Sequence, residues 1–128
     1  MGISLEQAQA VLDAALDKAL EIAVPVNIAV IDPGCFLKAF CSMDGAMPGA
    51  IELALGKART AALFFANTEE VWENCKPGGP FPGMERSNGG LVTFAGGMLL
   101  KAPNGAILGA MPRHFGPAPC ARAALLLS

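Results

Sequence analysis

The sequence predicts a single α+β domain, residues 1–128, in which helices flank an antiparallel β-sheet. Two stretches carry apolar residues three and four positions apart, which is the spacing of a helix with one buried face. Short β-rich runs are joined by turn sequences, which is the pattern of hairpins. No strand–helix–strand alternation is present, so a parallel sheet is not expected. The predicted order is α-β-β-α-β-β-α.

The first helix is predicted over residues 4–23. Ser4 and Gln7 have the spacing of a capping box, in which side chains satisfy backbone donors at the start of a helix. Pro25 cannot continue a helix and ends the segment. The expected buried face consists of Leu5, Ala8, Val11, Leu12, Ala15, Leu16, Ala19 and Leu20.

A hairpin is predicted next, with β-rich runs at residues 26–31 and 36–42 on either side of the turn residues 32–34. Since side chains alternate along a strand, Leu37 and Ala39 are expected to share one face of the second run.

A second helix is predicted over residues 48–66, because proline suits its first turn and an apolar stripe follows. Thr68 is expected to cap a short third helix that contains Trp72. The stripe of the second helix consists of Ile51, Leu55, Ala58, Ala62 and Phe65.

Residues 75–90 form a loop dense in glycine and proline, and long ordered loops in compact domains are often functional. Residues 91–111 are expected to form two or three strands. Within them, Gly96 and Gly97 predict a bend or bulge, and the Asn104-Gly105 pair predicts a hairpin turn. Residues 118–128 have the composition of a helix.

The amino-acid composition limits the kinds of partner that are expected for this protein. Hydrophobic residues make up 53% and charged residues 16%, so one small core leaves apolar surface uncovered and a homo-oligomer, at least a dimer, is expected. The net charge of −2 and the absence of a basic stripe argue against nucleic acid. No apolar run reaches the roughly 18 residues of a membrane span. The polar N-terminal sequence does not resemble a signal peptide, so a cytoplasmic location is expected.

The chemical groups of the sequence do not predict an enzyme. Its four cysteines have no CxxC spacing and His114 is the only histidine, so no metal site is expected and the cysteines are interpreted as reduced, buried thiols. A catalytic carboxylate pair, a Ser-His-Asp arrangement and a G-x-S-x-G motif are missing. The catalytic residues are therefore left unassigned.

Three segments together carry a family resemblance. The sequences VNIAVIDPGCFLKAF, GKARTAALF and KPGGPFPGMERSNGGLVTFAGGMLLKAPNGAILGA resemble the GlcG/HbpS family, the haem-degrading-domain family that also includes the PduO C-terminal domain. The resemblance covers residues 3–110. It implies a profilin- or PAS-like sheet flanked by helices, and oligomers assembled from dimers. Its members range from glycolate-operon proteins without assigned chemistry to haem-binding sensors.

Residues 112–128 depart from this family. Relatives would continue with a glycine-rich sequence and an acidic segment, whereas this chain has GAMPRHFGPAPC. Pro112 lacks a backbone donor, and Arg113 is bulky where a small residue is expected. A frameshift or a truncated gene end is our hypothesis for this change. His114 lies in the departing segment and is interpreted as a tail residue rather than as a haem ligand or general base.

The resemblance directs attention to Lys57 and Thr60, which are neighbours on one helix face. They are interpreted as a cation and a hydroxyl for a carboxylate-bearing ligand, or alternatively as a solvated lysine and a packed threonine. Asp44 either orients that lysine or makes the turn after the second strand.

The remaining ligand-binding candidates are glycines. Gly78 and Gly79, with residues 87–90, form either a backbone nest for an anion or a sharp loop. Gly96 and Gly97 complete the set. Met43 and Met47 either line an apolar pocket or fill the core.

Three functions remain open from the sequence. The first is a small-ligand-binding protein without clear catalytic machinery, with haem or another carboxylate-bearing molecule as its ligand. The second is a small enzyme that acts on a carboxylate-bearing metabolite through Lys57. The third is a structural oligomeric module whose pocket is vestigial.

Overall fold

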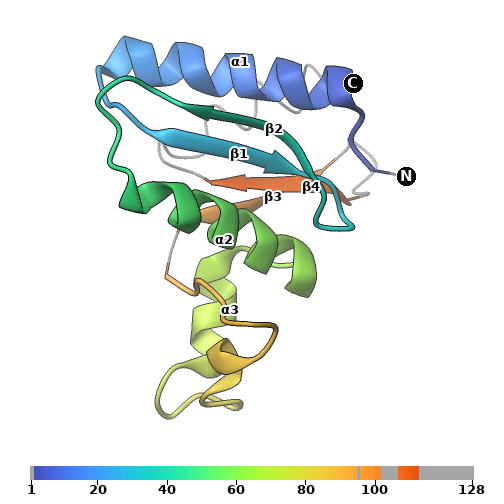
Figure 1. Ribbon diagram of the computed structural model, residues 1–128. Coiled ribbons are helices and arrows are strands. Elements are labelled where there is room, and N and C mark those ends of the chain that lie inside the picture. The colour runs from blue at the N-terminus through green and yellow to red at the C-terminus, as the bar shows by residue number, and fades with distance from the viewer. Residues whose placement is uncertain (1, 95, 102–106, 113–128) are drawn as a thin grey trace.

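The computed structural model describes residues 2–94, 96–101 and 107–112, and the fold is α+β, as the sequence predicts (Figure 1). The hairpin turn expected at Asn104-Gly105 and the helix expected at 118–128 lie outside the described residues. The elements in chain order are α1 (Leu5–Ile22), β1 (Asn27–Ile31), β2 (Leu37–Ser42), α2 (Gly49–Phe64), α3 (Thr68–Cys75), a short 3-10 helix η1 (Met84–Arg86), β3 (Gly97–Lys101) and β4 (Ile107–Pro112).

The strands form one antiparallel sheet in the order β2-β1-β4-β3. β1 pairs with β2, and β3 pairs with β4, so both predicted antiparallel pairs are confirmed. The two pairs join through β1 and β4, where Ile31 lies opposite Ala110. The first and last strands of the sequence are therefore the two central strands of the sheet.

The turn between β1 and β2 is built by one aspartate. The Asp32 carboxylate oxygen Oδ1 accepts hydrogen bonds from the backbone N–H groups of Gly34 at 2.9 Å and Phe36 at 3.0 Å. Cys35 takes the left-handed conformation with φ of 69°. The turn chemistry predicted from the sequence is therefore present, with Asp32 as its organising residue.

The helices cover both faces of the sheet (Figure 1). α1 packs on β1 and β2 from one side, and α2 packs on β1, β3 and β4 from the other. β1 is consequently buried along its whole length: Ile28 and Val30 belong to the core under α1, and Ile31 packs with Ala58 and Ala61 of α2. α3 lies beyond α2, away from the sheet (Figure 1).

α1 begins at the predicted capping box, because the Ser4 hydroxyl accepts from the Gln7 N–H and the Gln7 side chain accepts from the Ser4 N–H. The predicted stripe is wrong at its two ends, where Leu5 and Leu20 are each 63% exposed. The helix has 18 residues and spans about 27 Å. The five residues of β1 span only about 17 Å, so the ends of the stripe extend past the strands that would bury them.

The buried face of α2 also differs from the predicted stripe. Phe65 ends the helix in the left-handed conformation and is exposed. The face of α2 that packs on the sheet instead consists of small residues and two polar residues. The buried residues of α2 are Ala54, Lys57, Ala58, Thr60, Ala61 and Ala62. Small side chains allow a close approach between helix and sheet, which the bulky residues of the predicted stripe would prevent.

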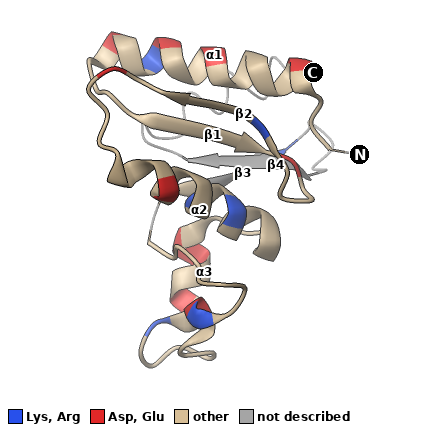
Figure 2. Cartoon of the chain, in the orientation of Figure 1, with Lys and Arg blue, Asp and Glu red and all other residues tan. Residues whose placement is uncertain are grey.

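Charged side chains lie on α1, α2 and α3 and at the ends of the strands, and β1 carries none (Figure 2). Among the helices in the described residues, none combines the length and the apolar character that crossing a membrane requires.

Candidate functional site

Side chains of α2 and α3 hold the segment that leads into β3. The Thr60 hydroxyl accepts a hydrogen bond from the Val92 N–H at 3.1 Å. The Thr68 hydroxyl accepts one from the Gly97 N–H at 2.8 Å, and the Asn67 side chain accepts one from the Leu99 N–H at 3.1 Å. The path of residues 91–99 is therefore set by three polar side chains of the helices.

This arrangement corrects the expected role of Thr68. The residue that caps α3 is Asn67, and Thr68 is the first residue of the helix. Neither side chain bonds to the helix start, because both bond to the backbone of residues 97–99. The polar side chains that the sequence suggests for capping the start of α3 instead form hydrogen bonds with residues about 30 positions away in the sequence.

Gly97 lies against α2 so closely that no side chain fits. An added Cβ would collide with the Lys57 carbonyl oxygen and lie 2.6 Å from Cγ2 of Thr68. Gly96 has a φ of +128°, and an added Cβ would lie 3.0 Å from the Lys57 ammonium nitrogen Nζ. The structure thus brings Lys57, Gly96 and Gly97 together, and both glycines are required by close approach rather than by an open anion cradle.

Lys57 is buried, with 9% of its surface exposed. Its Nζ lies 4.7 Å from the centroid of the Phe94 ring, a cation–π distance. Burial lowers the pKa of the Lys57 ammonium group. The interpretation of Lys57 as a solvated surface lysine is therefore wrong, whereas Thr60 is a packed, hydrogen-bonded threonine.

No Asp or Glu side chain forms a salt bridge with this lysine in the described residues. All Asp and Glu residues of the sequence lie in the described residues, where the salt bridges join Lys18 to Glu21 and Lys76 to Glu73. The Lys57 ammonium group faces an aromatic ring instead. A buried cation without an anion is costly, so the site favours a ligand that brings negative charge.

A hollow of about 490 Å³, a volume typical of small-molecule sites, is lined in part by the same Phe94 that contacts Lys57. Trp72 and Phe94 provide its aromatic surfaces, and they are 41% and 52% exposed. The other lining residues are Glu69, Glu73 and Thr93. The hollow combines stacking surfaces with two carboxylates, and its Phe94 is also in contact with Lys57.

Sequence reasoning missed Phe94 and did not assign Trp72 to a site. A signal for Phe94 is its position two residues before Gly96 and Gly97, since a large apolar side chain close to a pair of glycines at a strand start can cover the residues that pack against the glycines. For Trp72, the signal is that the only tryptophan of the chain lies among acidic residues on a short predicted helix.

Asp44 lies apart from this site. It lines a separate hollow of about 390 Å³ between α1 and β2, with Leu16, Leu20, Cys41, Ser42 and Met43. It forms no salt bridge with Lys57, so its interpretation as the turn after β2 fits the structure and the orienting role does not. Met43 packs against the core under α1, and Met47 is exposed.

Gly78 and Gly79 lie in the loop after α3 and do not line the hollow. An added Cβ at Gly79 would lie 2.8 Å from the Asn74 carbonyl oxygen, and the Gly79 N–H bonds to the Lys76 carbonyl. Gly78 has a φ of +85° with open space around it. Glycine is needed here to shape the turn, which favours the sharp-loop interpretation over the anion nest.

Metal and thiol chemistry find little support. The described residues contain no group of His, Cys, Asp and Glu that could hold a metal ion. Cys75 is buried, and burial together with the adjacent Glu85 raises the pKa of its thiol. Burial also raises the pKa of Cys41. Both thiols are therefore held in their unreactive protonated form.

The comparison with known families agrees with the resemblance. The pattern of the family described as "Haem degrading protein HbpS-like" matches residues 3–111. The chain belongs to the HbpS-like family. The match ends one residue before Pro112, where the sequence departs from its relatives.

Individual relatives are similar over most of the chain. An uncharacterised 15.0 kDa protein from the dhaT-dhaS intergenic region of Citrobacter freundii is 33% identical over 109 residues, which is 85% of this chain and 77% of that protein. A double mutant of HbpS from Streptomyces reticuli has a TM-score of 0.82 at 25% identity, with 100% of this chain and 88% of that chain covered. The structure of a PduOC–haem complex has a TM-score of 0.79 at 26% identity, with 99% and 93% covered.

Proposed function

We propose that this protein binds a flat small molecule with carboxylate groups at the hollow lined by Trp72 and Phe94, with haem as the first candidate. The observation that carries the proposal is Lys57, a buried ammonium group that forms no salt bridge with any Asp or Glu side chain, all of which lie in the described residues. A ligand carboxylate that reaches Lys57 past Phe94 would supply the missing negative charge. The similarity to a PduOC–haem complex supports a tetrapyrrole as that ligand.

The described residues that line the hollow can stack on the porphyrin ring of haem, but they do not supply a usual ligand for its iron. Trp72 and Phe94 offer stacking surfaces for a macrocycle. Among the described residues that line the hollow, none is a His, Cys or Met, which are usual axial ligands of haem iron, and the sequence has no tyrosine. Binding would therefore depend on apolar burial and on the charge of Lys57. We expect weak haem binding with a poorly defined spectrum.

Fluorescence tests this proposal directly. Trp72 is the only tryptophan and the chain has no tyrosine, so the intrinsic emission reports on the hollow alone. Haemin and iron-free protoporphyrin IX should both quench the emission of Trp72 with similar affinity, because stacking rather than iron ligation holds them. Lys57→Gln should weaken both, and Lys101→Gln, which changes an exposed lysine on β3, should weaken neither.

Three outcomes would contradict the proposal. Equal quenching by haemin in wild type and Lys57→Gln would show that Lys57 does not meet the ligand. A sharp low-spin haem spectrum that disappears in His114→Ala would place the site in the tail and make His114 its central residue. No quenching by either compound would favour a structural module with a vestigial pocket.

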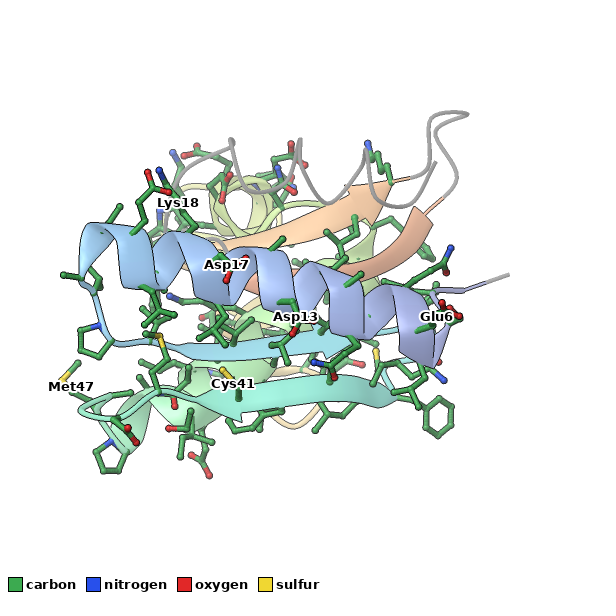
Figure 3. All side chains as sticks on the ribbon, turned by 90° about the horizontal axis from the view of Figure 1, so that it is seen from above. Glu6, Asp13, Asp17, Lys18, Cys41 and Met47 are labelled. Carbon is green, nitrogen blue, oxygen red and sulfur yellow. The ribbon has the colours of Figure 1, made fainter. Side chains whose placement is uncertain are left out.

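We further propose that the protein self-associates. Large apolar side chains are exposed around α1 and β2, among them Leu20, Phe36, Leu37 and Met47. Figure 3 shows Met47 in the segment that follows β2, with its side chain projecting away from the molecule. In the part of the chain that the structure describes, β2 is also an edge strand, because only β1 pairs with it. Light scattering should show a mass above that of one 13.1 kDa chain, and a monomer at high micromolar concentration would refute this.

A further inference from the structure

The surroundings of Lys57 are those of an amine nucleophile. Lysine is nucleophilic in its neutral form, and burial among apolar groups favours that form. The Lys57 Nζ lies between the Phe94 ring and the backbone of Gly96, without a carboxylate that would hold the proton on it. The same features that attract an anionic ligand therefore also leave the amine ready to react when no anion is present.

The other lysines differ in their surroundings. Lys18 and Lys76 form salt bridges with glutamates three residues away. Lys101 is exposed to water on β3, and Lys38 is half-buried on β2. Lys57 alone is buried, and burial lowers the pKa of its side chain. Chemistry that requires a neutral amine near pH 7 should therefore select Lys57 from the five lysines of the sequence.

Phe94 links this amine to the hollow. The ring covers Nζ on one side and lines the hollow of about 490 Å³ together with Trp72. Because Phe94 is half exposed, rotation of its side chain into solvent meets little packing and would open the hollow toward Nζ. A flat aromatic molecule that takes the place of the ring would bring a substituent next to the amine.

We propose that Lys57 forms an imine with an aromatic aldehyde that occupies the hollow lined by Trp72 and Phe94. The Nζ lone pair attacks the aldehyde carbon, a C–N bond forms and the carbonyl oxygen takes up a proton to give a carbinolamine. Loss of the hydroxyl group as water then leaves the C=N bond. One aldehyde and one amine thus give one imine and one water, without any oxidant or reductant. The inference rests on the hollow of the proposed function but does not require haem.

Reductive trapping tests the inference. The folded protein is treated at pH 7 with benzaldehyde and sodium cyanoborohydride, whose hydride converts the imine to a stable benzylamine, and the label is located by peptide mass spectrometry. Each unit by which a lysine pKa is lowered gives about tenfold more neutral amine at this pH. We therefore expect Lys57 to be labelled faster than the exposed Lys101 in the folded protein. Urea-unfolded protein should lose this preference, which provides a control that needs no variant.

The outcomes separate this inference from the proposed function. Labelling of Lys57 no faster than that of Lys101 in the folded protein would overturn the inference. Lys57→Arg has no primary amine that can form an imine, so it should lose the preferred label. Selective labelling without haemin quenching would support the imine and contradict tetrapyrrole binding, and the reverse result would do the opposite.

Discussion

The close approach of β3 to α2 predicts a large effect for a single added methyl group, the substitution Gly97→Ala. The added Cβ would collide with the Lys57 carbonyl oxygen and lie 2.6 Å from Cγ2 of Thr68. The first obstacle is helix backbone and the second is a side chain with 0% exposure, so neither moves away by a rotamer change. The strand must shift away from the helix, and the Gly97–Thr68 hydrogen bond of 2.8 Å must lengthen.

The magnitude follows from these two losses. Overpacking a well-packed core costs about 1–3 kcal/mol, and the weakened buried hydrogen bond adds about 1 kcal/mol. We expect Gly97→Ala to lower the free energy of unfolding by about 2–4 kcal/mol. At about 4 °C per kcal/mol for a domain of this size, the melting temperature should fall by about 8–16 °C.

Urea unfolding followed by Trp72 emission measures the effect. The matched control is Gly49→Ala at the first residue of α2, where an added Cβ meets nothing within 4 Å. Alanine is the better helix former there, so the control should be neutral or stabilised by up to about 1 kcal/mol. If Gly97→Ala unfolds within about 0.5 kcal/mol of wild type, β3 does not press on α2 and the burial of Lys57 needs another explanation.

Three further predictions concern buried polar groups. Thr68→Val removes the acceptor of the buried Gly97 N–H and should lower the free energy of unfolding in urea by about 1–3 kcal/mol, whereas Thr68→Ser keeps the hydroxyl and should lower it by less. A loss for Thr68→Ser as large as that for Thr68→Val would contradict the importance of this hydrogen bond. Because the pKa of Lys57 is lowered in the folded protein, the unfolded chain holds a proton on this side chain at pH values where the folded chain does not. The free energy of unfolding should therefore rise with pH between the lowered pKa and about 10.5, the value in the unfolded chain, and Lys57→Met should abolish this rise. Iodoacetamide at pH 8 should label the half-buried Cys35 before the buried Cys75, and the opposite order would mean that α3 opens readily.

Local chemistry explains the parts of the fold that were predictable. The Ser4–Gln7 capping box and the turn at Asp32 each depend on residues within four positions, so short-range rules suffice for them. The antiparallel pairs were predictable for the same reason, because each joins neighbouring segments. The strand order was not, because the contact between β1 and β4 joins segments about 80 positions apart.

The candidate site was predictable only in part. Lys57, Gly96 and Gly97 were identified by family resemblance, and the structure brings them together. The burial of Lys57 was not predictable, because it depends on how closely β3 approaches α2. Phe94 escaped notice because its role comes from the path of residues 91–97, which Thr60 and the start of α3 determine through long-range hydrogen bonds.

The central position of β1 and β4 has a consequence for how the chain reaches its fold. β1 is apolar and buried on both faces, yet one of its two neighbours is the last strand in the sequence. During synthesis the β1–β2 hairpin can form early, but its inner edge has no partner until residues 107–112 have left the ribosome. The nascent chain thus carries an unprotected sheet edge for most of its translation. A fragment that stops after α3 should aggregate unless a chaperone shields β1.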